Sequence, residues 1–140
     1  MAIKQLNPYL NYDGNAAKAI ALYEKVLGAK TEGLQKFGDM PGGKPDPATK
    51  DRVLHAVLRI GGGMLMISDG MPGKPPTMGD NVHISLDCDD EADMAQKFDG
   101  LSAGGKIVMP LQDTFWGARF GMLVDPFGIP WMFNFQKKPA

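Results

Sequence analysis

The residues TFWGARFGMLVDPFGIPWMFN, at positions 114–134, carry the clearest structural signal in this chain. At their centre, Asp125, Pro126 and Gly128 occupy the first, second and fourth positions of a type I turn, where these residue types are preferred. After the turn, aromatic side chains alternate with other residues from Trp131 to Phe135, which is the period of a β-strand with two different faces. The segment therefore predicts a β-hairpin.

Elements of the same kind are predicted in the same order in the two halves of the chain. In the first half we expect a strand near residues 4–10, a helix over about 15–27, and strands near 29–36, 52–60 and 63–68. In the second half we expect a strand over 82–87, a helix over about 90–101, and strands near 106–110, 118–124 and 130–135. Gly28 and Gly104 are placed to end the helices, and Gly63-Met64-Leu65 aligns with Gly121-Met122-Leu123. This pattern predicts two βαβββ modules.

Segments rich in proline and glycine separate these elements. Residues 38–50 show no periodicity and predict a long loop inside the first module. Residues 69–80 have the composition of a linker. A length of 140 residues suits one domain, residues 1–140, with module one at about 3–68 and module two at about 81–136.

Several short segments add to the hairpin: Pro8-Tyr9-Leu10-Asn11-Tyr12, Gly14-Asn15-Ala16, Leu22-Tyr23-Glu24-Lys25-Val26-Leu27-Gly28-Ala29, Leu54-His55-Ala56 and Ser68-Asp69-Gly70. Together with the hairpin they resemble the PhnB-like branch of the vicinal oxygen chelate superfamily. That superfamily contains glyoxalase I, extradiol dioxygenases, fosfomycin resistance enzymes and bleomycin-binding proteins.

The resemblance implies an α+β fold, in which two βαβββ modules form a curved mixed sheet around a cavity with the helices outside. It also implies a homodimer. In the strand over 82–87, alternate residues from Val82 to Leu86 would pack under the helix, and those from His83 to Asp87 would face the cavity.

Metal-dependent members of the superfamily hold a divalent ion with histidine and glutamate side chains from the first and last strands of each module. His83 matches the histidine of the second module. The matching position of the first module falls at Pro8 or Tyr9, and the two carboxylate positions fall at Met132 and near Met66. Because thioethers are poor ligands for such ions, we expect no metal site of the usual kind and no other cofactor.

A divalent metal remains possible through a rearranged ligand set of Asp69, Asp87 and His55. For His55 two interpretations stay open: a half-buried histidine bonded to a neighbouring strand or loop, and a residue of the cavity.

The candidate ligand-binding residues are His83, Tyr9, Trp116, Arg119, Trp131 and His55. Imidazole, phenol and guanidinium groups would supply hydrogen bonds, and an indole would wall an apolar pocket. Trp116 and Trp131 also suit a protein core.

Composition excludes several classes of protein. A net charge of −1 without a cluster of lysine and arginine argues against a nucleic-acid or anionic membrane partner. Cys88 is the only cysteine, so an intrachain disulfide and a cysteine-rich zinc site are excluded. Residues 1–7 lack the apolar region of a signal peptide, and no apolar run has the length of a transmembrane helix. We therefore expect a cytoplasmic protein.

Two functions follow from these observations. The first is a protein that binds a small molecule in a cavity lined by methionine and tryptophan, without the usual metal. The alternative is a metal-dependent lyase, dioxygenase or resistance enzyme with a rearranged ligand set.

Overall fold

The computed structural model describes residues 2–42 and 46–137. The chain divides into two compact units, residues 1–77 and 78–140, and the boundary lies inside the expected linker over 69–80. Each unit contains one helix and a four-stranded mixed sheet, which gives the α+β fold expected from the sequence.

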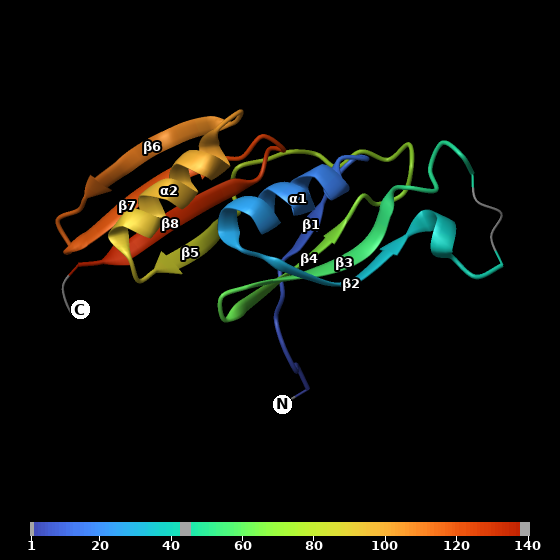
Figure 1. The fold of residues 1–140 in the computed structure, drawn as a ribbon, viewed down its shortest axis with the longest axis horizontal. Coiled ribbons are helices and arrows are strands. Elements are labelled where there is room, and N and C mark those ends of the chain that lie inside the picture. Colours follow the sequence, from blue (N-terminus) through green and yellow to red (C-terminus); the bar gives the residue numbers. More distant parts are fainter. Residues whose placement is uncertain (1, 43–45, 138–140) are drawn as a thin grey trace. The chain divides into compact units, whose positions relative to one another are not determined.

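The elements of the first unit are β1 (Tyr9–Asn11), α1 (Ala16–Leu27), β2 (Lys30–Lys36), the short 3₁₀ helix η1 (Phe37–Asp39), β3 (Val53–Ile60) and β4 (Gly63–Ser68). The strand order is β1-β4-β3-β2, with β1 parallel to β4 and the other neighbours antiparallel. Helix α1 lies along one face of this sheet (Figure 1).

The core of the first unit lies between α1 and that face of the sheet. Helix residues spaced by three or four positions are buried there: Ala16, Ala19, Ile20, Tyr23 and Leu27. Gly28 ends the helix in the left-handed conformation at φ 70°, as its position predicted.

The elements of the second unit are β5 (Ile84–Cys88), α2 (Glu91–Ser102), β6 (Lys106–Asp113), β7 (Ala118–Val124) and β8 (Pro130–Gln136). The strand order β5-β8-β7-β6 repeats the order of the first unit, again with one parallel pair, β5 with β8. Figure 1 shows α2 along β7 and β8.

Aromatic packing under α2 defines the core of the second unit. Phe98 of α2 meets Phe133 of β8 edge to face, with 5.4 Å between ring centroids. Gly121 of β7 lies directly below the helix, and a Cβ at this position would stand 2.9 Å from Phe98. The glycine therefore allows the close approach of α2 to the sheet.

The predicted hairpin of the second unit is confirmed. The backbone N–H of Gly128 donates to the carbonyl of Asp125 over 3.0 Å, which closes the type I turn between β7 and β8. The long loop expected in the first module is also present, since residues 37–52 join β2 to β3 whereas residues 114–117 join β6 to β7.

The proposed alignment of the two Gly-Met-Leu tripeptides is wrong. Gly63-Met64-Leu65 lies in β4 and Gly121-Met122-Leu123 lies in β7, whereas the matching strand orders make β4 equivalent to β8. In a chain with 18 glycines and 10 methionines, such a short match arises from composition.

The first strand of each unit begins later than expected. β1 begins at Tyr9, where the pairing with Met66 of its parallel partner β4 begins. β5 begins at Ile84, where pairing with Trp131 begins. Val82 precedes this strand and is 69% exposed, so the expectation that it packs under the helix is wrong.

Candidate functional site

The sheet of the first unit has a face that α1 does not cover, which we call the first open face. In register across its strands lie Tyr9 of β1, Met66 of β4, Val57 of β3 and Glu32 of β2. Residues paired in this way point to the same side of a sheet. Their neighbours at the opposite parity, among them Ile67 and Leu58, are buried under α1.

Tyr9 and His55 meet on the first open face. The hydroxyl of Tyr9 lies 2.9 Å from Nδ1 of His55, and the two rings are 5.6 Å apart at an interplanar angle of 53°. This contact contains part of both interpretations of His55. The ring bonds to a tyrosine on another strand of the sheet, β1, and it still belongs to a face that the helix leaves uncovered.

The second unit has a corresponding second open face on the side of its sheet away from α2. One register row joins Ser85 of β5, Met132 of β8, Met122 of β7 and Met109 of β6. Three methionines thus lie side by side on three neighbouring strands. Methionine is flexible and polarisable, so such a row can adapt to ligands of different shape.

Aromatic rings lie in and beside the loop that enters β7. Trp116 is 52% exposed, and its ring centroid lies 5.0 Å from Phe115 and 6.1 Å from Phe120. Phe115 is 97% exposed. Phe120 belongs to the second open face, because it shares the parity of Met122 on β7. Trp116 is therefore available to a ligand on this side of the sheet.

Trp131 lies in the core of the second unit, since it is paired with Leu123 on the helix side of the sheet and is 0% exposed. Its indole N–H donates to Oδ2 of Asp125 over 2.9 Å. We therefore leave Trp131 out of the proposed ligand site, although the sequence included it.

Arg119 also lies away from the second open face, at the parity of Gly121 and under α2. Its guanidinium is 3.2 Å from Asp113 and 3.6 Å from Glu91, and Lys137 joins the same cluster at 2.9 Å from Asp113. Hydrogen bonds from Lys137 and Arg119 lower the pKa of Asp113, and its carboxylate raises the pKa of Lys137. Arg119 thus belongs to a network of ion pairs at the end of the sheet.

His83 stands one residue before β5 and is half-buried. Within the part of the chain that the structure describes, no side-chain hydrogen bond involves its ring. The ring is therefore not committed to a structural partner there.

In each module the first strand pairs with the last strand, so the two registers can be compared. With Met66 taken as the counterpart of Met132, Tyr9 pairs with Met66 as Ser85 pairs with Met132, and Asn7 then matches His83. Pro8 and Tyr9, the positions expected from the resemblance, are offset from it by one and two residues.

Asp69, one member of the possible rearranged metal set, has both carboxylate oxygens bonded to the backbone. Oδ1 accepts from Gly14 and Ala16, at 2.8 and 2.9 Å, and Oδ2 accepts from Val53 at 2.7 Å. Among residues 2–42 and 46–137, no three histidine, cysteine or acidic side chains are grouped to hold a metal. The absence of a bound metal stays a prediction.

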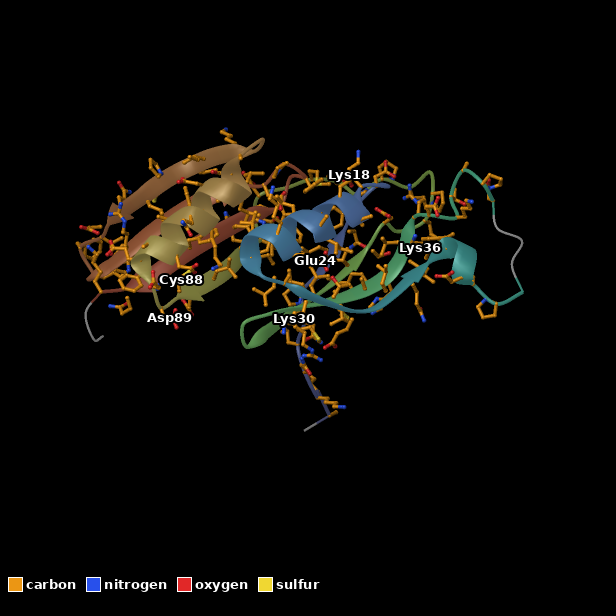
Figure 2. All side chains as sticks on the ribbon, in the orientation of Figure 1. Lys18, Glu24, Lys30, Lys36, Cys88 and Asp89 are labelled. Atoms are coloured by element: carbon orange, nitrogen blue, oxygen red, sulfur yellow. The ribbon has the colours of Figure 1, made fainter. Side chains whose placement is uncertain are left out.

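Cys88 ends β5, next to Asp89 at the start of the turn into α2 (Figure 2). Burial raises the pKa of the Cys88 thiol, the charge of Lys97 partly offsets this, and nearby acidic residues raise it further. A raised pKa leaves little thiolate at neutral pH, so this environment does not suit a nucleophilic cysteine.

Sequence reasoning expected methionines in the ligand site but missed which of them share a row, and it missed the bond between Tyr9 and His55. The sequence marked Met66 and Met132 as poor metal ligands. The row to which each belongs follows from strand register, and turn lengths and bulges set that register. Tyr9 and His55 are separated by 46 residues, and only the sheet order brings their strands to either side of β4.

The fold and these two faces are those of a glyoxalase-like α+β protein with paired modules. The model of the Glyoxalase/Bleomycin resistance protein/Dioxygenase superfamily matches residues 5–133, and the chain belongs to this family. The resemblance stated from the short segments is thereby confirmed.

Relatives of known sequence and structure agree with this assignment. Protein YjdN of Escherichia coli is 39% identical over 143 residues, covering 95% of this chain and 96% of that protein. The crystal structure of protein PA1353 from Pseudomonas aeruginosa is 39% identical, covers 97% of this chain and 100% of that one, and has a TM-score of 0.85. A PhnB protein from Bacillus cereus has the same fold, with a TM-score of 0.78 at 22% identity over 94% of this chain and 99% of its own.

Helices long and apolar enough to cross a membrane do not occur among the described residues.

Proposed function

We propose that this chain is a small-molecule binding protein of the glyoxalase/bleomycin resistance superfamily and works without the usual metal. The observation that carries the proposal is the row of methionines on the second open face, with Phe120 and the exposed Trp116 beside it. Apolar and aromatic side chains with a few polar groups are typical of ligand sites. Ser85 and His83 would supply such polar groups.

Tryptophan fluorescence tests this proposal because the chain has two tryptophans in different environments. A planar aromatic probe, 2-acetonaphthone, should quench the emission of the wild-type protein in a saturable way. Trp116→Phe should remove most of the quenching, while Trp131 continues to report an intact core. Saturable quenching that is unchanged in Trp116→Phe would place the site elsewhere.

His83→Ala should weaken binding of the same probe about threefold to tenfold, the scale of one hydrogen bond. Its free energy of unfolding should stay within about 0.5 kcal/mol of wild type, because the half-buried ring has no side-chain hydrogen bond within the described residues. Urea unfolding checks this, and a loss of several kcal/mol would instead make His83 a structural residue.

We propose that the protein holds no tightly bound transition metal, since the expected carboxylate positions are Met66 and Met132. Elemental analysis of purified protein, before and after incubation with Ni, Zn, Mn and Fe, should find far less than one ion per chain. About one ion per chain, lost on His83→Ala, would favour the alternative of a metal-dependent lyase, dioxygenase or resistance enzyme.

We also propose that the protein is a cytoplasmic homodimer. The single cysteine fits a reducing compartment, and exposed apolar residues such as Phe115 fit association with a second copy.

A further inference from the structure

The bond between Tyr9 and His55 spans the middle of the first open face. Both β1 and β3 are neighbours of β4, so the phenol ring must extend across β4 to reach the imidazole. Neighbouring strands are about 4.8 Å apart, which makes this a distance that a tyrosine can cover. Ser68, the β4 residue between them on this face, is 6% exposed, consistent with cover by the two rings.

The hydrogen bond selects one form of the imidazole. A phenol is a strong donor, and the unprotonated nitrogen of a neutral imidazole is its natural acceptor. When Tyr9 donates to Nδ1, the ring proton of neutral His55 is on Nε2. With Tyr9 as the donor, the bond holds both the orientation and the tautomer of the ring.

Nε2 of His55 is left as a donor without a protein partner. Within residues 2–42 and 46–137, no hydrogen bond involves this atom, and the one buried side-chain nitrogen or oxygen without a partner is Nε of Arg52. Nε2 is therefore accessible. An oriented, accessible donor suits an acceptor atom of a ligand.

Apolar side chains lie beside this donor on the same face. Val57 follows His55 by two positions on β3, and Met66 stands between Val57 and Tyr9. Both are half-buried, and the Tyr9 residue is 43% exposed. These groups offer a surface for the apolar body of a ligand whose polar end meets His55.

We propose that Tyr9 and His55 form a second binding site, which takes a small apolar or aromatic molecule through a carbonyl or carboxylate oxygen. His55 Nε2–H is the donor, and Tyr9 is the residue that positions it. This site deepens the proposed binding function and rests on it, but it belongs to the first unit, whereas Trp116 belongs to the second.

The charged groups near this donor are already paired. Arg59 of β3 contacts both carboxylate oxygens of Glu32 of β2 at 3.1 Å, and the β4 residues of this face are uncharged. Gln35, the register partner of His55, is uncharged as well. These register partners supply no unpaired charge that favours a carboxylate over a neutral carbonyl, so the test must separate the two.

Nitrogen NMR of the imidazoles tests the geometry, and the chain has only two histidines to assign. Long-range ¹H–¹⁵N spectra at pH 8 should show His55 as the Nε2–H tautomer. Tyr9→Phe should return the signal to a mixture of tautomers while His83 stays unchanged. A Nδ1–H tautomer in wild type, or no effect of Tyr9→Phe, would overturn the proposal.

Three matched probes test the ligand class: 2-naphthoate, 2-acetonaphthone and 2-methylnaphthalene. Binding is followed by perturbation of the His55 signals and by calorimetry. His55→Ala should weaken the two oxygen-bearing probes about tenfold and Tyr9→Phe about threefold, the scale of one oriented hydrogen bond. Neither substitution should change the affinity for 2-methylnaphthalene by more than about twofold. Lys18→Ala, on the exposed side of α1 in Figure 2, is the control and should bind as wild type.

The wild-type affinities for 2-naphthoate and 2-acetonaphthone, compared at pH 8, separate the two oxygen sources. Equal losses of affinity for all three probes in His55→Ala would show that the ring contributes contact area and no hydrogen bond. This result would overturn the proposal. If the probes still quench Trp116 fluorescence and their affinities are unchanged by His55→Ala and Tyr9→Phe, the second site is overturned and the proposed function stands. If none of the probes binds, both proposals fail for this class of ligand.

Discussion

Asp69 and Asp125 are 2% exposed, and each accepts several hydrogen bonds from backbone or side-chain groups. Asp69 caps the start of α1 through Ala16, although Asn15 occupies the capping position and makes no side-chain cap. Asp125 accepts from Phe127 at 2.8 Å within its own turn. These contacts give Asp69 of the Ser-Asp-Gly segment and Asp125 of the Asp-Pro-Phe-Gly segment structural roles.

Trp131→Phe is predicted to destabilise the protein by about 2–4 kcal/mol. The substitution removes the donor to Oδ2 of Asp125 and leaves a cavity in the core. Urea unfolding followed by circular dichroism measures the change. Trp116→Phe is the matched control and should lose less than about 0.5 kcal/mol, because Trp116 is 52% exposed. A loss below about 1 kcal/mol for Trp131→Phe would contradict a structural role.

At the scale of elements, four charged residues join the ends of β6, β7 and β8 to the start of α2. They are Glu91, Asp113, Arg119 and Lys137. Because these groups are at the surface, each pair is expected to contribute little on its own, and salt should screen it.

Asp113→Asn is predicted to lower the melting temperature near neutral pH and to lose this effect in acid. The folded-state pKa of Asp113 lies below its ordinary 3.8, so its contribution is present above that value and disappears as pH falls through the lower folded value. The pKa of Lys137 lies above its ordinary 10.5, so its contribution persists below 10.5 and is lost at higher pH.

The difference in melting temperature between wild type and Asp113→Asn should therefore be constant from about pH 5 to about pH 10. It should shrink below pH 3.8 and in high salt. A difference that grows on acidification would show that the cluster does not stabilise the fold in this way.

At the scale of the whole molecule, two units with the same strand order come from one chain of 15.1 kDa. β2 and β6 are edge strands within their sheets, and Ile107 and Val108 of β6 are 47% and 53% exposed. Exposed edges and apolar side chains favour association with another chain.

Sedimentation equilibrium should give a mass of about 30 kDa, twice that of the chain, at high micromolar concentration. Phe115→Ser removes the exposed phenyl ring of the loop that enters β7. It tests whether this loop is part of the dimer interface. A mass of 15.1 kDa throughout the concentration range would contradict the homodimer.

The sequence alone determined the elements and their order, because hydrophobic period and turn chemistry act over a few residues. The helix over about 15–27 was found at Ala16–Leu27, and the strands over 63–68 and 118–124 have the predicted bounds. Only the tertiary structure decided which side chains share a face, because register depends on pairing between distant strands. It buried Trp131, placed Arg119 in a surface charge cluster at the start of α2, and brought Tyr9 to His55 across β4.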